Sequence, residues 1–157
     1  MSFLRFLMLL SLIVWLGGLI FFPVIAQTAF SVLPTRHLAA AMVGRSLGIL
    51  HWMGMISGLV FLGSSLLLNR LSNGEVHAFA PRNVLICLML LLTLISQFGI
   101  IPRMDAIRAS IGEIDATPVD LPARVQFDAL HHWSTRIEIG VLLLGLVVAY
   151  LATRSLT

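Results

Sequence analysis

Four long apolar runs constrain this 157-residue chain more than any other feature of its sequence. The runs cover residues 6–26, 46–69, 84–101 and 137–152. Each is close to the roughly 20 residues that a helix needs to cross about 30 Å of hydrocarbon. Hydrophobic residues make up 59% of the chain and charged residues 11%, with a mean hydropathy of +1.01, which is outside the range of soluble domains. The sequence therefore predicts an all-α integral membrane protein.

The short connections between these runs determine the expected architecture. They make consecutive spans antiparallel neighbours, and four spans bring both termini to the same side of the membrane. We predict an up-down four-helix bundle, with residues 1–157 forming a single four-span domain. Arg5 precedes the first run as in a signal peptide, but the run is too long for one and no small-x-small cleavage site follows it. We interpret this run as a retained anchor.

Residues that start and stop helices agree with four spans. Thr35 is suited to cap the N-terminus of the second helix, and Gly74 to end it. Pro81 is expected to open the third helix, because proline lacks the amide hydrogen that a first turn leaves unpaired. Pro23 should bend the first helix near its far end, and Pro102 marks a kink or an exit in the third.

The segment that follows Pro102, RMDAIRASIGEI, has an amphipathic pattern. Its apolar stripe consists of Ile107, Ile111 and Ile114. Its polar flank consists of Arg103, Arg108 and Glu113. We expect an interfacial extension of the third helix here. The loop ATPVDLP separates this extension from the fourth helix, which should begin just after Asp120 and carry an Arg124–Asp128 pair one turn apart.

The fourth apolar run is too short to cross the membrane without polar residues. Residues 139–152 number only 14, or about 21 Å of helix at 1.5 Å per residue. The span must therefore include Glu138, Arg136 and Ser134, which places the membrane boundary near Trp133. An ionisable residue at the centre of a span costs about 2.5 to 3.5 kcal/mol, so its presence needs a structural or functional reason.

Polar side chains from all four spans are predicted to gather at one end of the bundle. Counting about 20 residues along each span brings the following residues to that end: Gln27, His51, Gln97, His131, His132, Arg136 and Glu138. On the fourth helix, His131, Ser134 and Glu138 share one stripe, because they are three to four residues apart. The opposite end of the bundle is expected to hold no comparable set.

A haem b or metal site is one reading of this polar end. Two histidines on different helices at one depth are the arrangement that a b-type haem requires, and neutral imidazole is the commonest metal ligand. His51 and His131 are the predicted ligand pair, with His132 in reserve. Arg136 would pair with haem propionates, and the set of residues expected around the cofactor is completed by Gln27 and Gln97.

Copper is a weaker alternative on the same side of the bundle. Met53 and Met55 flank Gly54 near His51, and thioethers together with imidazole suit Cu(I). A purely structural reading also stands, in which Arg136 and Glu138 reach the head groups or pair with charges on other helices. A zinc hydrolase is disfavoured because no HExxH spacing occurs.

Three segments of the chain resemble a known family. They are WLGGLIFFPVIAQTAF (residues 15–30), PRMDAIRA (102–109) and FDALHHWS (127–134), and they resemble the bacterial family related to transmembrane protein 205, a domain of unknown function. That family is distantly similar to the membrane domain of copper resistance protein D and to HemJ-type protoporphyrinogen oxidases. HemJ-type proteins carry a histidine early in their first helix, whereas RFLMLLSLIVW has none, which argues against a HemJ-like activity.

The resemblance also implies roles for individual residues. In the first helix it implies that Trp15 and its neighbours Gly17 and Gly18 serve packing. It places Arg103 and Asp105 at the mouth of the bundle. Finally, it matches two residues of the fourth helix, His131 and Ser134, to the family's histidine and serine, which favours His131 over His132 as a ligand.

Two functions follow from these observations. The first is a small membrane protein whose polar end holds haem b or a metal for electron transfer or metal handling. The second is a structural or accessory subunit without a cofactor, which packs in a larger membrane complex or a homo-oligomer. No nucleophile-base pair indicates an enzyme, and the scattered arginines with a net charge of +3 indicate no nucleic-acid partner. We expect a multi-pass protein of the bacterial inner membrane with cytoplasmic termini.

Overall fold

The computed structural model describes residues 1–74 and 77–154, and the secondary structure of these residues is entirely helical. In chain order the elements are α1 (Ser2–Val32), α2 (Arg36–Asn73), α3 (Pro81–Ile95), the π-helix η1 (Ser96–Ile100), α4 (Ile101–Ile111), the 3₁₀ helix η2 (Ile114–Ala116) and α5 (Pro122–Arg154). Because α3, η1 and α4 follow one another without a break, the described chain contains four helical rods long and apolar enough to cross a membrane. The predicted four-helix membrane bundle is confirmed, and the protein is a multi-pass membrane protein.

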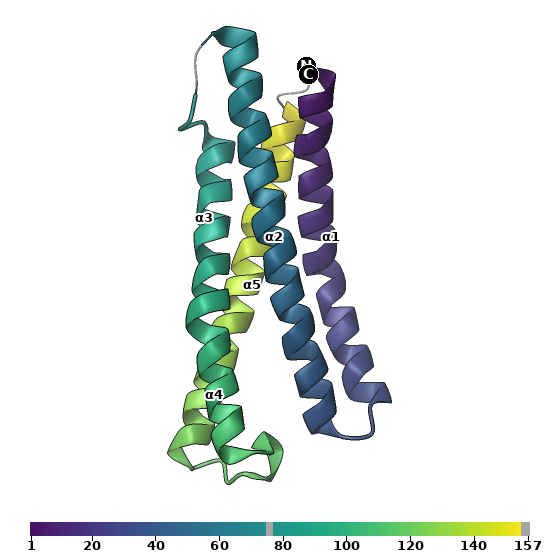
Figure 1. Cartoon of the computed structure of the whole chain (residues 1–157), viewed down its shortest axis with the longest axis vertical. Helices are drawn as coiled ribbons and strands as arrows, with labels where there is room; N and C mark the ends of the chain where they lie inside the picture. Colours follow the sequence, from purple (N-terminus) through teal and green to yellow (C-terminus); the bar gives the residue numbers. More distant parts are fainter. Residues whose placement is uncertain (75–76, 155–157) are drawn as a thin grey trace.

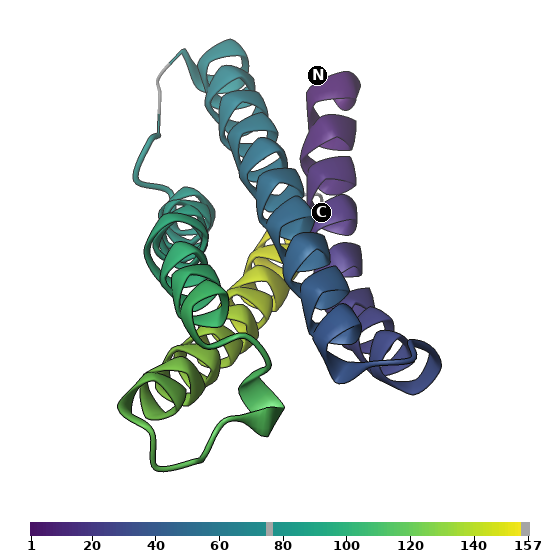
Figure 2. The ribbon, with the colours of Figure 1, turned by 60° about the horizontal axis from the view of Figure 1, so that its bottom comes forward.

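Consecutive rods run antiparallel, and the start of α1 and the end of α5 lie at the same end of the bundle (Figure 1). The most extensive packing is between α1 and α2, while α5 packs mainly against α3. In Figure 2, α1 and α2 lean away from α4 and α5 at the end farther from the termini. The pair α1–α2 and the pair α4–α5 therefore separate toward that end.

Trp15 fixes the close approach of α1 to α2. Its side chain is only 2% exposed. A side chain at Gly54 or Gly58 would collide with the indole ring, so these two glycines make the space that Trp15 fills. Gly18 likewise lies against α2, whereas Gly17 has open space around it, so only one of the two implied packing glycines has that role.

The helix ends follow the sequence signals. The side chain of Thr35 accepts a hydrogen bond from the amide of Leu38 at 3.2 Å, and Gly74 ends α2 with a φ of +72°, a left-handed conformation that favours glycine. Pro81 occupies the first turn of α3. Pro23 lies inside α1, and Figure 1 shows the lower part of this helix leaning away from its upper part.

The amphipathic extension is present as α4, with one difference. Ile107 and Ile111 are half-buried and Arg103 is exposed, as expected from the pattern. Arg108, however, is not on a solvated face: its side chain is 18% exposed and its guanidinium lies over the ring of Phe127, 5.5 Å from the ring centre. The polar flank therefore splits, because α5 returns beside α4 and covers part of it.

The entry into α5 was also predicted closely. The helix begins at Pro122, two residues after Asp120. Arg124 donates from Nε to Asp128 Oδ2 at 3.0 Å, which is the expected pair one turn apart, and its Nη1 also donates to the carbonyl oxygen of Ile114. The second of these bonds holds the start of α5 to η2.

Candidate functional site

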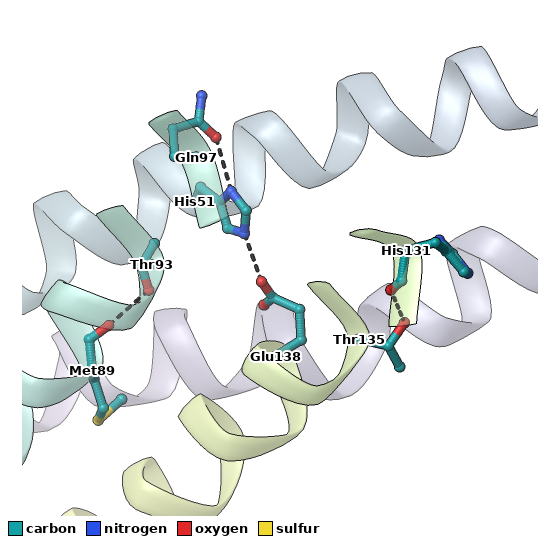
Figure 3. A network of polar contacts seen from close by, with 7 residues as sticks. All are labelled: His51, Met89, Thr93, Gln97, His131, Thr135 and Glu138. Carbon is teal, nitrogen blue, oxygen red and sulfur yellow. Dashed lines mark hydrogen bonds and ion pairs between the residues drawn. The ribbon is translucent and has the colours of Figure 1, made fainter. Parts of the chain in front are cut away.

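The most buried ionisable group at the predicted polar end is the imidazole of His51, on α2. This residue is 2% exposed, and both of its ring nitrogens have side-chain partners. Nδ1 lies 2.8 Å from Gln97 Oε1 in η1, and Nε2 lies 2.6 Å from Glu138 Oε1 on α5 (Figure 3). Three rods are thus joined through one side chain. We call Gln97, His51 and Glu138 the polar triad.

A local irregularity of the helix accompanies the position of Gln97. It lies in the π-helical turn Ser96–Ile100, which adds one residue to the helical repeat and shifts the side-chain positions around the axis. The hydroxyl of Ser96 in the same turn is fully buried and has no hydrogen-bond partner among the described residues. Such turns cost backbone hydrogen bonding and occur frequently at functional sites.

The polar triad has two proton arrangements with the same total charge. In one, His51 is an imidazolium that donates from Nδ1 to Gln97 and from Nε2 to the Glu138 carboxylate. In the other, the proton lies on Glu138, whose hydroxyl donates to Nε2 of a neutral ring. The Nε2–Oε1 separation of 2.6 Å places the two groups in direct hydrogen-bond contact. Both arrangements leave no nitrogen of the buried ring unpaired.

Glu138 also faces a cleft of about 550 Å³ between α1, α2, α4 and α5. Its apolar walls include Leu19 and Phe22 of α1, Leu47 of α2 and Leu142 of α5. The charged residues that line it are Arg36, Arg108, Arg124, Asp128 and Glu138. The cleft therefore combines an apolar interior with charged groups, and Glu138 links it to the buried imidazole.

The structure brings together only part of the predicted site. Gln97, His51 and Glu138 meet as expected, and His131 and Ser134 share the Glu138 stripe, since all three line the cleft. The imidazole of His131 is exposed and points away from His51 in Figure 3. It is Glu138 that occupies the side of the His51 ring where the predicted haem or metal pair needs His131.

The remaining predicted residues lie outside the polar triad. Gln27, His132 and Arg136 are all exposed. Arg136 places its guanidinium 5.5 Å from the centre of the Trp133 ring, which is the behaviour expected of a side chain that extends toward the membrane surface. Counting along the spans brought these residues to one end together with the three members of the triad, but it could not tell which of them face inward.

The donor set does not fit haem or a metal in this conformation. Each ring nitrogen of His51 already has a partner, whereas an axial or metal ligand needs one nitrogen facing the metal. Within residues 1–74 and 77–154, no group of three or more histidine, cysteine, aspartate or glutamate residues is arranged to hold a metal ion. Met53, suggested for copper, directs its methyl group toward Gly18 on α1.

A second polar cluster occupies the end of the bundle near the termini, where the sequence had indicated nothing comparable. Arg82 of α3 donates from Nε to Ser65 Oγ at 3.2 Å and from Nη2 to Asn69 Oδ1 at 3.3 Å, both on α2. Ser65 is fully buried and Asn69 nearly so. We call Arg82, Ser65 and Asn69 the arginine cluster. The four-residue spacing of Ser65 and Asn69, which puts both on one helix face, was the signal that could have revealed it.

The fold and the triad define a class: a small four-span membrane protein with a buried, ionisable polar triad beside an amphipathic cleft. Residues 10–113 match the family described as "Domain of unknown function (DUF4149)", which is more than half of the chain, and the chain therefore belongs to this family. The matched region contains His51 and Gln97, and it ends before α5, which carries Glu138. No curated protein and no solved structure matches the chain.

Proposed function

We propose that this protein binds an amphiphilic molecule of the bilayer in the cleft, and that occupancy moves a proton within the His51–Glu138 pair. The observation that carries the proposal is that Glu138 contacts His51 and also lines the cleft. Its carboxyl group is 2.6 Å from the buried His51 ring, and its side chain also lines the cleft. Whatever enters the cleft therefore changes the surroundings of a group that is bonded to His51.

The shape and chemistry of the cleft support an amphiphilic occupant. Its volume of about 550 Å³ lies in the usual range of about 300 to 1,000 Å³ for small-molecule sites. The apolar side chains of Leu19, Phe22 and Leu142 would contact an apolar body, while Arg108, whose buried Nε has no hydrogen-bond partner among the described residues, offers a donor to a polar head. A molecule already dissolved in the bilayer has both features.

The proton step follows from desolvation. An empty cleft admits water, which stabilises the imidazolium–carboxylate form of the pair. An apolar occupant removes that water and disfavours charge, so the proton moves from His51 Nε2 to Glu138 Oε1 and both groups become neutral. The total charge does not change, and Gln97 still accepts from Nδ1. Binding is thereby coupled to the protonation state of a group inside the bundle.

Two neighbouring alanines provide a matched test of the cleft. Ala40 lines it, whereas Ala41 is exposed and is not among its lining residues. Ala40→Trp should fill the cleft and Ala41→Trp should not. In native mass spectrometry of protein released from membranes, wild type and Ala41→Trp should retain lipid-mass adducts that Ala40→Trp loses. Equal adducts in all three proteins would contradict the proposal.

The proton step has its own readout. Adding a polar lipid extract of the expression host to delipidated protein should convert a carboxylate infrared band into a carboxylic acid band. The change should be absent in Glu138→Gln, which keeps the shape of the side chain but cannot titrate, and it should persist in Asp128→Asn. A lipid-induced band that survives in Glu138→Gln would assign the proton to another group.

The sequence-based hypothesis of haem b or copper at His51 remains a separate proposal, supported by the resemblance to the transmembrane protein 205-related family and its distant copper- and haem-associated relatives. It requires His51 to release Glu138 or Gln97. An absorption spectrum of the purified protein tests it directly, because bound haem gives a Soret band that His51→Ala should remove. A colourless preparation that co-purifies with larger partners would instead favour the accessory-subunit alternative.

A further inference from the structure

The exposure of the residues that line the cleft differs from rod to rod. On α1 and α5 five lining residues are exposed, namely Pro23, Phe30, His131, Thr135 and Ile139. Among the described lining residues of α2 and α4, exposure is confined to Arg36, the first residue of α2. A residue that lines a cleft and is also exposed lies at its rim. The cleft therefore opens between α1 and α5, and we call the rim formed by these five residues the lateral opening.

Arg108 of α4 covers the opposite side of the cleft. A Cβ atom at Gly44 on α2 would lie 3.8 Å from its Nη1, an ordinary van der Waals separation. Its guanidinium also lies over the ring of Phe127 on α5, 5.5 Å from the ring centre. From α4 this side chain thus reaches both neighbouring rods, whereas no such bridge is printed by the geometry of the rim between α1 and α5 in the described chain.

The lateral opening faces hydrocarbon over part of its length. Pro23 lies within the first apolar run, residues 6–26. Ile139 lies about 9 Å of helix beyond the predicted membrane boundary at Trp133, whereas Thr135 lies close to that boundary. Side chains at the depth of Pro23 and Ile139 contact acyl chains rather than water. The opening therefore extends from the membrane boundary into the hydrocarbon.

The polarity of the cleft runs in the same direction as that of a lipid in the adjoining leaflet. Leu19 and Leu142, near the middle of their spans, form its apolar end, and Arg108 lies toward the membrane boundary. A lipid beside the opening already has its polar group at the boundary and its chains toward the middle of the bilayer. Such a molecule can enter sideways without turning over.

We propose that an acyl chain of a bilayer lipid enters the cleft sideways from the hydrocarbon, through the lateral opening. This inference rests on the proposed function and names the chemical class of the occupant and its route. Apolar walls that face a void lose van der Waals contacts, and a chain restores them. Because these contacts are made with the chain, the inference requires no particular charge on the head group.

Ile139 and Leu143 form a matched pair for the test. They are one turn apart on α5 and 53% and 58% exposed, but Leu143 is not a lining residue of the cleft. Protein carrying phosphatidylcholine is mixed with deuterated phosphatidylcholine in micelles, and native mass spectrometry follows the exchange. Ile139→Trp should slow the exchange roughly ten-fold, because a larger side chain obstructs the passing lipid chain, and Leu143→Trp should not. Equal exchange rates in the two variants would overturn the inference.

A reversible bridge tests the route without relying on side-chain bulk. Ala26 and Thr135 line the cleft from α1 and α5. In Ala26→Cys/Thr135→Cys/Cys87→Ala, a flexible, reducible thiol cross-linker can join the two rods across the opening. The bridge should trap lipid in loaded protein and exclude it from delipidated protein, and a reductant should reverse both effects. Exchange that continues in the bridged protein would place the entry elsewhere and overturn the inference.

Two further results separate this inference from the proposed function. Glycerophosphocholine, which is the same head group without chains, should not displace the bound lipid, and displacement would overturn the requirement for an acyl chain. If Ala40→Trp loses bound lipid while Ile139→Trp exchanges as fast as Leu143→Trp, the proposed function stands and the lateral route fails.

Discussion

The polar triad and the arginine cluster both place polar groups inside the bundle, yet they differ in what they leave for a ligand. In the arginine cluster, Arg82 donates to Ser65 and Asn69, neutral partners on the adjacent helix α2. In the triad, His51 pairs with Glu138, which also lines the cleft. None of the three residues of the arginine cluster lines that cleft. Burial of polar groups alone therefore does not mark a site; an ionisable pair that reaches a cleft does.

The largest effect on stability is expected when the carboxyl group of Glu138 is removed from the triad. Glu138→Ala leaves Nε2 of a buried imidazole without a partner, and we expect the free energy of unfolding to fall by about 1 to 3 kcal/mol. Denaturation in mixed micelles measures this. Glu138→Gln, which keeps the volume and a hydrogen-bonding group at that position, should lose less; an equal loss in the two variants would show that neither of these contributes and that only the carboxyl group itself stabilises the protein.

A smaller effect is expected in the arginine cluster. Arg82→Ala removes the donor to Ser65 and Asn69, and hydrogen bonds within membranes average about 0.6 kcal/mol with a maximum near 1.7 kcal/mol. We therefore expect the unfolding free energy to fall by about 1 kcal/mol, with lipid adducts in native mass spectrometry unchanged. Loss of the adducts in this variant would erase the distinction between the two clusters.

Gln97→Ala should have a still smaller effect on stability. It removes one neutral partner of His51, and we expect a loss of about 0.6 kcal/mol, the average for such bonds in a membrane. The variant is also informative about proton position, because the ring loses its Nδ1 acceptor. The carboxylic acid band should therefore be larger after lipid is added, or should already be present without lipid. An infrared spectrum identical to that of wild type would contradict the account.

The smallest change in stability is expected when the pair is removed as a whole. Replacing both partners of a buried polar pair with apolar groups is nearly neutral, so the free energy of unfolding of His51→Leu/Glu138→Leu should be close to that of wild type. The lipid-induced proton shift should nevertheless disappear. If instead the double variant is as unstable as Glu138→Ala, the pair is needed for folding rather than for coupling to the cleft.

Much of the architecture could be predicted because helices in a membrane follow one-dimensional signals. The lengths of apolar runs, Thr35, Gly74 and Pro81 indicated the spans and their ends, and the length of the fourth run showed that Glu138 must lie within it. The expectation that His51 and Gln97 lie at the same end of the bundle followed in the same way, and their contact agrees with it. These inferences need only the rise per residue and the thickness of the bilayer.

The direction in which each side chain faces could not be read in this way. Helix rotation depends on packing between rods, such as Trp15 against Gly54, so sequence counting could not separate inward Glu138 from exposed His131. The π-helical turn at Gln97 was not predicted either, because Pro102 after it indicated a kink or an exit but not the additional residue that changes the side-chain register. The arginine cluster was not predicted, because two small polar residues within an apolar run do not individually indicate a polar cluster.

The central claim is that His51 is bonded to Glu138 and Gln97 rather than to a ligand shared with His131. Nitrogen-15 NMR of the histidine side chains in the purified protein tests it most directly, with the His51 signals assigned by their loss in His51→Asn. We predict that Glu138→Gln shifts mainly Nε2 of His51, that Gln97→Ala shifts mainly Nδ1, and that His131→Ala shifts neither. A His51 signal that responds to His131→Ala and ignores Glu138→Gln would contradict the account.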